Sequence, residues 1–218
     1  MINRRRRWSI AIVAIVIVAV GVSVVFLYRE RWSSSNLSWD VQIGDEFIYE
    51  LESIYRYSDS NFNATVFTRM SALNHTQVRM EIVLLPDIPP LLDDDILAAE
   101  IINIVKTHCT FDNGSELPVY YSDEINQLLS ACLLPTGDWD LLDRCFMNEV
   151  SNAFYPGAYT SELQVDHFNI GYEVWPGDAT IRWSANVTLE NGVPLEIFSE
   201  NNSFSVGTYT SFQLTIRL

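Results

Sequence analysis

The stretch FNIGYEVWPGDATIRWSANVTLENGVPLEIF, residues 168–198, decides the fold of this chain. Apolar side chains recur at every second position along it, and the turn sequences PGD (176–178) and ENG (190–192) separate the alternating runs at hairpin distances. A period of two is typical of a strand with one buried face, and it places Val193, Leu195 and Ile197 on that face of the last run. We therefore predict an antiparallel meander with one solvated face over the C-terminal part of the chain.

A second β block lies nearer the N-terminus. Residues 39–51 alternate in the same way, with an interruption at Gly44-Asp45 that predicts a turn. Residues 65–73 are expected to pair with residues 76–85 in a hairpin across Asn74-His75, because asparagine tolerates the positive φ of a tight turn.

Between the two β blocks the apolar period changes to that of a helix. One helix is expected from residue 89 to about residue 106, a second from a cap at Ser122 to Pro135, and a third from near Asp138. One-faced strands and amphipathic helices bury their apolar sides most simply against each other. The predicted fold is therefore α+β: an N-terminal transmembrane helix, then a curved antiparallel β-sheet with about three helices inserted between two β blocks.

The predicted membrane segment is an uncharged apolar run of 21 residues, 8–28. As a helix it would be about 31 Å long, which matches a hydrocarbon core of about 30 Å. Four arginines at 4–7 precede the run, and the heavier basic flank stays in the cytoplasm. We therefore divide the chain into a basic tail and anchor (1–32), a linker (33–38) and one extracytoplasmic α+β domain (39–218).

A cleaved secretory signal is the alternative interpretation of this N-terminus. Such a signal has an apolar stretch of about 7–15 residues that ends in a small-x-small site, whereas this run is longer and ends in VFLY at residues 25–28. We therefore favour a retained single-pass anchor in the cell membrane, with the N-terminus cytoplasmic and the C-terminal domain extracellular.

The charge of the chain after residue 32 excludes one class of partner. This part holds 7 basic and 27 acidic residues, a formal net charge of −20. Nucleic-acid binding needs a basic surface, so we expect no nucleic-acid partner. The acidity fits solubility outside the cell or a cationic partner.

Asn-x-Ser/Thr acceptors are more frequent than chance predicts. The chain has six, where 15 Asn and 32 Ser plus Thr would give about two at random. The excess indicates exposure to an N-glycosylation machinery. Asn186 falls on the polar side of its strand, and we expect the other acceptors in turns, loops or the linker. The predicted glycosylation sites are Asn36, Asn63, Asn74, Asn113, Asn186 and Asn201.

The three cysteines, Cys109, Cys132 and Cys145, allow at most one intrachain disulfide. An oxidising exterior would permit a bridge, but the spacing does not identify the pair. Burial of all three as apolar thiols is an equal alternative.

Catalytic and metal-binding patterns are sparse. His75, His108 and His167 are not spaced to share one helix face, so we predict no transition-metal site and no cofactor. Residues 59–70 begin like a calcium loop, but Ala64 and Met70 replace the required Gly and Glu. The acidic runs at 93–95 and 138–143 are interpreted as a helix N-terminus and a solvated helix face.

Aromatic residues offer a further candidate. We expect the Trp183 side chain in the core, because it points to the same side of its predicted strand as the alternating apolar residues. Trp175 points to the opposite side from the alternating apolar residues and could contact a carbohydrate or a protein. Packing in the core or at its rim is the simpler interpretation.

Three motifs carry a resemblance to a known group. WxVxxGDxFxY at 39–49, LPxGDW at 134–139 and NGVPL at 191–195 resemble uncharacterised, membrane-anchored surface proteins of archaea over most of residues 39–218. That group implies no activity. A curved sheet that cradles helices also resembles, at the level of fold alone, lipoprotein-carrier half-barrels that hold acyl chains.

These observations predict a non-enzymatic surface binding or interaction module with a lipid, glycan or protein ligand outside the cell. The first alternative is a carrier of a hydrophobic, lipid-like ligand on a half-barrel sheet. The second is a carboxylate-dependent hydrolase, which would need two acidic groups about 5–10 Å apart.

Overall fold

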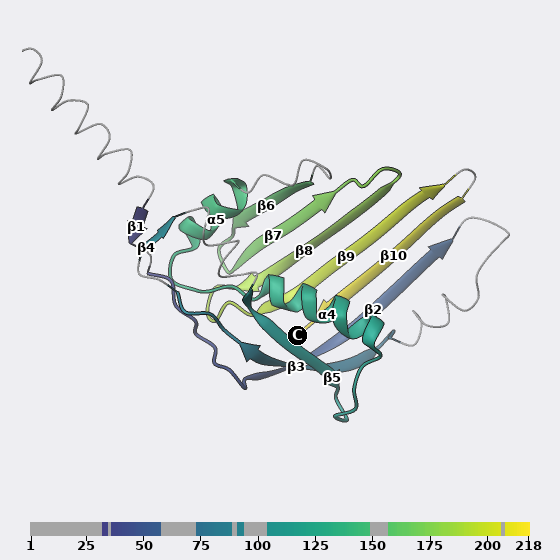
Figure 1. The fold of residues 1–218 in the computed structure, drawn as a ribbon, viewed down its shortest axis with the longest axis horizontal. Helices are drawn as coiled ribbons and strands as arrows, with labels where there is room; N and C mark the ends of the chain where they lie inside the picture. Colours follow the sequence, from purple (N-terminus) through teal and green to yellow (C-terminus); the bar gives the residue numbers. More distant parts are fainter. Residues whose placement is uncertain are drawn as a thin grey trace, which may run out of the picture.

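The computed structural model describes residues 32–34, 36–57, 73–88, 91–93, 104–148, 157–205 and 208–218. Most of the strands in these ranges join one eight-stranded sheet of order β5-β3-β2-β10-β9-β8-β7-β6 (Figure 1). The strands of this sheet are β2 (Glu46–Tyr57), β3 (Thr76–Leu84), β5 (Lys106–Phe111), β6 (Gly157–Leu163), β7 (His167–Val174), β8 (Ala179–Thr188), β9 (Pro194–Ser205) and β10 (Thr208–Arg217). Two short strands, β1 (Trp32–Ser34) and β4 (Leu91–Asp93), form a separate antiparallel pair.

The predicted antiparallel sheet is confirmed, and one strand pair joins its two blocks. Every neighbouring pair in the sheet is antiparallel. β2 from the N-terminal block pairs with β10 from the C-terminal block, with Leu51 opposite Ile216. Both side chains are fully buried, so this long-range pair lies at the centre of the core.

Two helices cover one face of the sheet, which we call the helix-bearing face (Figure 1). Helix α4 (Val119–Cys132) follows Pro118 and buries the predicted apolar stripe, which is Ile125, Leu128, Leu129, Cys132 and Leu133. Helix α5 (Trp139–Asn148) begins where the Asp138 carboxylate accepts a hydrogen bond from the Leu141 amide at 3.1 Å. Both helices lie between β5 and β6 in the sequence, as predicted.

The predicted α+β class with three helices is wrong. The described residues form mainly one eight-stranded antiparallel sheet with two short helices. The helix expected from residue 89 to residue 106 is replaced at both of its ends by strands, Leu91–Asp93 in β4 and Lys106 in β5. Residues 94–103 lie outside the described ranges. Strand pairing at each end overrides the helical spacing of the apolar residues, which is a weak local preference.

The predicted membrane segment, residues 8–28, also lies outside the described residues. Within the ranges that the structure covers, no helix combines the length and the apolar character needed to cross a bilayer.

The predicted hairpin between residues 65–73 and 76–85 is wrong for its second strand. β3 pairs with β2 on one side and with β5 on the other, so both of its edges are occupied. The residue with positive φ in the preceding turn is His75, at 56°, rather than Asn74. Residues 58–72 lie outside the described ranges. The local turn signal is real, but burial of Val78 and Met80 against distant strands decides the pairing.

The helix-bearing face holds the core because alternating residues of successive strands meet there in register. One row of directly opposed residues crosses five strands, and each member is at most 2% exposed. The row consists of Ile170, Ala185, Ile197, Ile216 and Leu51.

Leu195 departs from the predicted alternation. Asn186 lies opposite Glu196 and Val187 lies opposite Pro194, so Leu195 is an extra residue on β9. It is 41% exposed, whereas Val193 and Ile197 are fully buried. The prediction that all three share the buried face is wrong at Leu195, because a β-bulge turns the inserted residue out of the alternation.

The chain enters the domain through residues 36–40, which we call the strap. Ser38 and Thr136 exchange two backbone hydrogen bonds of 2.9 and 2.8 Å. The Trp39 indole donates a hydrogen bond of 2.8 Å to the carbonyl oxygen of Pro86. The Leu134 amide donates to the carbonyl oxygen of Gly192 at 3.0 Å. The loop that joins α4 to α5 is thus held between the strap and the β8–β9 turn.

Candidate functional site

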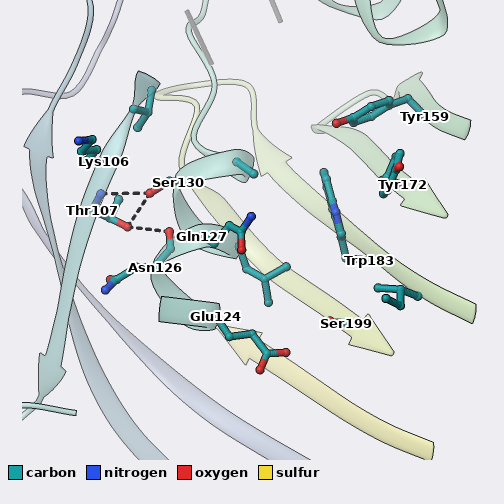
Figure 2. Close-up of a pocket in the computed structure, with 14 residues that line it drawn as sticks. Lys106, Thr107, Glu124, Asn126, Gln127, Ser130, Tyr159, Tyr172, Trp183 and Ser199 are labelled. Atoms are coloured by element: carbon teal, nitrogen blue, oxygen red, sulfur yellow. Dashed lines mark hydrogen bonds between the residues drawn. The ribbon is translucent and has the colours of Figure 1, made fainter. Parts of the chain in front are cut away.

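A cleft of about 710 Å³ lies beside α4 on the helix-bearing face (Figure 2). It has an aromatic side contributed by the sheet and a polar side contributed by α4 and the start of β5. Its lining residues are Val105, Lys106, Thr107, Glu124, Asn126, Gln127, Leu128, Ser130, Ala131, Tyr159, Tyr172, Ile181, Trp183 and Ser199.

The aromatic side is a row of rings on three adjacent strands. Tyr159 lies directly opposite Tyr172, and Tyr172 directly opposite Trp183. The ring centroids of Tyr159 and Tyr172 are 4.7 Å apart, and those of Tyr172 and Trp183 are 6.5 Å apart. All three side chains are half-buried. They form the apolar surface of the cleft.

A second set of rings holds this aromatic row in place. Phe146 on α5 packs against Tyr159 with centroids 5.8 Å apart, and against Phe168 at 6.4 Å. Trp139 also packs against Phe168, with ring centroids 5.3 Å apart. Aromatic contacts at these separations add to the stability given by buried area. The row therefore rests on a packed support under α5.

Helix α4 presents different residues to its two sides. Glu124, Gln127, Leu128 and Ala131 are spaced i, i+3, i+4 and i+7, so they share one side of the helix. Figure 2 shows Gln127 between the helix axis and Trp183. This side of α4 forms the wall of the cleft opposite the aromatic row.

The other side of α4 is bonded to β5. The Thr107 amide donates to the Ser130 hydroxyl at 3.1 Å, and the Thr107 hydroxyl donates to the backbone carbonyl of Asn126 at 3.1 Å (Figure 2). The Thr107 and Ser130 hydroxyls are 3.0 Å apart and also share a hydrogen bond. These contacts set the distance of α4 from the sheet edge and hence the width of the cleft.

Glu124 is the acidic residue in the cleft lining. Burial raises the pKa of its carboxyl above the ordinary value for glutamate. The described lining contains no second carboxylate. The paired carboxylates that acid-base hydrolysis needs are therefore not assembled among the described residues here.

The structure places the predicted glycosylation sites in different surroundings. Asn36, Asn74 and Asn113 are exposed, and Asn63 lies outside the described residues. Asn186 is half-buried on the face of the sheet opposite the helices. Asn201 lies within β9, opposite Ile181 and Phe212 on the helix-bearing face. The expectation that Asn201 lies in a turn or loop is wrong, because β9 continues through it to Ser205.

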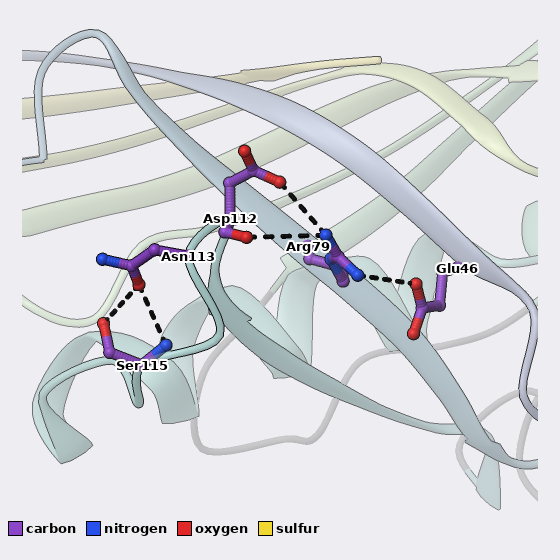
Figure 3. Close-up of polar contacts among 5 residues, drawn as sticks. All are labelled: Glu46, Arg79, Asp112, Asn113 and Ser115. Atoms are coloured by element: carbon purple, nitrogen blue, oxygen red, sulfur yellow. Dashed lines mark hydrogen bonds and ion pairs between the residues drawn. The ribbon is translucent and has the colours of Figure 1, made fainter.

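The Asn113 acceptor adopts a compact turn. Its side-chain oxygen accepts hydrogen bonds from the Ser115 amide at 2.9 Å and the Ser115 hydroxyl at 2.7 Å (Figure 3). Nearby, Arg79 forms ion pairs with Glu46 at 3.0 Å and Asp112 at 3.3 Å. These three charged side chains are partly exposed, so the cluster contributes little to stability.

The three cysteines are buried and none is in a disulfide. Burial raises the pKa of Cys109 to about 12, and it raises the pKa of Cys132 further. The thiolate, which is the reactive form, is therefore suppressed at both positions.

The histidines and the acidic run at 138–143 lie apart from the cleft, and residues 94–95 of the other run lie outside the described residues. His75, His108 and His167 each face one carboxylate, at 3.3, 3.5 and 2.7 Å. Among the described residues, no group of three or more His, Cys, Asp or Glu side chains is arranged to hold a metal ion. Asp143 accepts a hydrogen bond of 2.6 Å from the Ser161 hydroxyl, so part of the run at 138–143 is structural.

Sequence reasoning missed the cleft. The prediction that Trp183 belongs to the core is confirmed in part: its side chain packs against the core, but it is half-buried and also lines the cleft. Trp175, the predicted contact residue, is 46% exposed and is not among the lining residues. A hairpin centred on residues 177–178 places Tyr172 directly opposite Trp183. The predicted turn at residues 176–178 could therefore have predicted the contact between these two rings.

No family model matches this chain, and no curated protein or solved structure is significantly similar to it.

Proposed function

We propose that this chain is a non-enzymatic binding module that works outside the cell, tethered at the cell membrane by residues 8–28, and that the cleft beside α4 is its ligand site. The observation that carries this proposal is the row Tyr159, Tyr172 and Trp183, which lines a cleft of about 710 Å³ opposite polar side chains of α4. Clefts of this size with apolar walls and a few polar groups are the usual form of small-ligand sites.

Binding fits the lining better than catalysis does. Glu124 lacks a partner carboxylate among the described lining residues, and the hydroxyls of Thr107 and Ser130 are bonded to each other. None of the three histidines is among the described lining residues, so no imidazole lies beside either hydroxyl to act as its base. The same groups can orient a ligand through hydrogen bonds.

The position of the strap supports presentation of the cleft away from the membrane. The strap binds the α4–α5 loop, which contacts the β8–β9 turn at one end of the strands. The β7–β8 turn at residues 176–178 lies at the opposite end (Figure 1). Ile181, near that far end, lines the cleft and is 37% exposed. The cleft therefore continues toward the end of the sheet that is remote from the strap.

The proposed location has a direct test. Protease added to intact cells that express the full chain should remove an epitope tag at the C-terminus and leave an N-terminal tag intact. The same protease should cut both tags after the cells are lysed. Protection of the C-terminal tag in intact cells would contradict an extracellular domain.

The proposed site is tested with defined probes and a matched pair of tryptophan variants. The full chain in lipid nanodiscs is examined by saturation-transfer NMR with neutral methyl glycosides, with hexanol and octanol, and with short peptides. At least one class should bind, and Trp183→Ala should abolish that binding. Trp175→Ala removes an exposed tryptophan outside the cleft and should leave it unchanged.

Circular dichroism and the urea unfolding midpoint verify that both variants are folded. Binding by no class, or binding that survives the loss of Trp183, would overturn the assignment of the cleft as the ligand site. Empty nanodiscs correct for partition of the alcohols into lipid.

A further inference from the structure

We propose, on the basis of the function proposed above, that the ligand of the cleft is a neutral saccharide, which lays the C–H face of a sugar ring on Trp183 and Tyr172 and directs its hydroxyls to Gln127 and Glu124. The juxtaposition of an aromatic row with an amide and a carboxyl on the facing helix carries this assignment.

The aromatic row suits the apolar face of a sugar. The Tyr172 and Trp183 rings are tilted by 35° with centroids 6.5 Å apart, so they offer a shallow, angled surface rather than a deep pocket. Aromatic faces carry partial negative charge, and the C–H groups of a sugar ring carry partial positive charge. Figure 2 shows Trp183 standing between α4 and the two tyrosines, where it can contact a ring from the helix side.

The facing wall suits the hydroxyl groups of the same sugar. Gln127 and Glu124 are one helical turn apart on the side of α4 that faces the row. An amide donates and accepts, and a carboxyl accepts, so together they can satisfy neighbouring hydroxyls. The Ser199 hydroxyl lies directly opposite Trp183 in the sheet and adds a polar group at the base of the cleft.

An acyl chain matches this lining less well. Covering Gln127 and Glu124 with a hydrocarbon would bury a donor and acceptors without partners, at a cost of about 1–3 kcal/mol for each group. The exposure of Ile181 at the far end also leaves part of a bound chain in water.

Charge disfavours an anionic ligand. After residue 32 the chain carries 27 acidic and 7 basic residues, and the repulsion acts on any approaching anion. Lys106 is the basic residue among the described lining residues. It lies at the start of β5, on the side of α4 away from the aromatic row (Figure 2). Uronic acids, sulfated sugars and fatty acids are therefore poor candidates.

The experiment is a titration of the full chain in nanodiscs with neutral oligosaccharides of glucose, mannose and N-acetylglucosamine, and with uronic acid oligomers of the same length. At least one neutral series should bind, and the acidic series should bind at least about tenfold more weakly. Trp183→Ala should raise the Kd for the neutral series at least about tenfold, since a ring contact and its buried area are lost.

Gln127→Ala provides a second variant, because Gln127 is exposed on α4 and its loss leaves the core intact. It should raise the Kd about threefold to tenfold, as expected for one hydrogen bond. Its matched control is Asp123→Ala, an exposed position of the same helix outside the lining, which should leave the Kd unchanged.

The failure of this inference is distinguishable from the failure of the proposed function. If alcohols or peptides bind in a Trp183-dependent manner and no neutral sugar does, the saccharide assignment is overturned and the binding function stands. Equal binding of neutral and acidic oligomers also overturns the saccharide assignment. If no probe class binds, both proposals fall.

Discussion

Replacing Gly192 by alanine should lower the free energy of unfolding by about 3 kcal/mol, because the new methyl group meets both backbone strain and a fixed neighbour. Gly192 has a φ of +73°, which L-residues with a side chain adopt at a cost. A Cβ at this position would overlap the carbonyl oxygen of Leu134 and lie 2.9 Å from its carbonyl carbon. Urea unfolding of the full chain, followed by circular dichroism, measures the loss.

The two backbones cannot separate easily. The Leu134 amide donates to the Gly192 carbonyl at 3.0 Å, and the Gly192 amide donates to the Thr188 carbonyl at 3.0 Å. Leu134 is fully buried and is the second residue after the end of α4. A shift that relieves the overlap therefore breaks a hydrogen bond or moves the end of α4, and with it one wall of the cleft.

Gly177→Ala is the matched control for this prediction. Gly177 also has a positive φ, +62°, but nothing lies within 4 Å of the position its Cβ would take. The free energy of unfolding of this variant should fall by only about 1 kcal/mol, which is the cost of a positive φ for a residue with a Cβ. Equal losses for the two variants would show that the contact with Leu134 contributes nothing.

The second large effect is expected for Arg182→Met, on the face of the sheet opposite the helices. Glu200 pairs with Arg182 at 2.5 Å, and its side chain is only 7% exposed. Without Arg182, a nearly buried carboxylate loses its cationic partner and keeps only uncharged ones, Gln213 at 2.7 Å and the Asn202 side chain. We expect the free energy of unfolding to fall by about 2–3 kcal/mol at pH 7, as measured by urea unfolding. The Glu200 carboxylate would still be removed from water on folding but would no longer have a positively charged partner.

The pH dependence gives this prediction a distinct signature. Burial raises the pKa of Glu200, but the hydrogen bond from Gln213 and the charge of Arg182 outweigh it, so the pKa is lowered below 4.5. The pair therefore stabilises the protein above the unfolded pKa, and this contribution disappears as the pH falls through the folded pKa. The difference between wild type and Arg182→Met should be largest near pH 7 and shrink below pH 4.5.

Arg217→Met is the matched control on the same face. Arg217 pairs with Glu52 at 2.9 Å and with Glu196 at 2.7 Å, but these carboxylates are 39% and 40% exposed. The loss should stay below about 1 kcal/mol, as for surface ion pairs. Adding Glu200→Gln to Arg182→Met should recover most of the larger loss, and failure to recover would contradict the role of the buried charge.

The two predictions concern opposite faces of the same strands. Glu200 and Arg182 are one residue away from Ser199 and Trp183, which face the cleft. A change in stability at Arg182 that leaves ligand binding intact would separate the structural face of the sheet from the proposed binding face.

The sequence by itself determined the elements whose signals are local. The alternation in residues 168–198 and its turns predicted β7, β8 and β9, since a period of two and a tight turn specify a hairpin without distant partners. The apolar stripe within residues 125–133 predicted α4, although the helix begins at Val119 and not after the predicted cap Ser122. Asp138 marked the start of α5. The half-buried Trp183 lies on the predicted side of its strand, but the alternation could not tell core from cleft.

Only the tertiary structure decided the features that depend on residues far apart in the chain. The pairing of β2 with β10 and of β3 with β2 and β5 follows from burial of their shared apolar face, which no local pattern records. The cleft exists because α4 is bonded to β5 on one side and stands apart from the aromatic row on the other. The alternation of side chains along a strand predicts which face of the sheet a residue occupies. The position of the covering helix decides whether that face is packed or open to solvent.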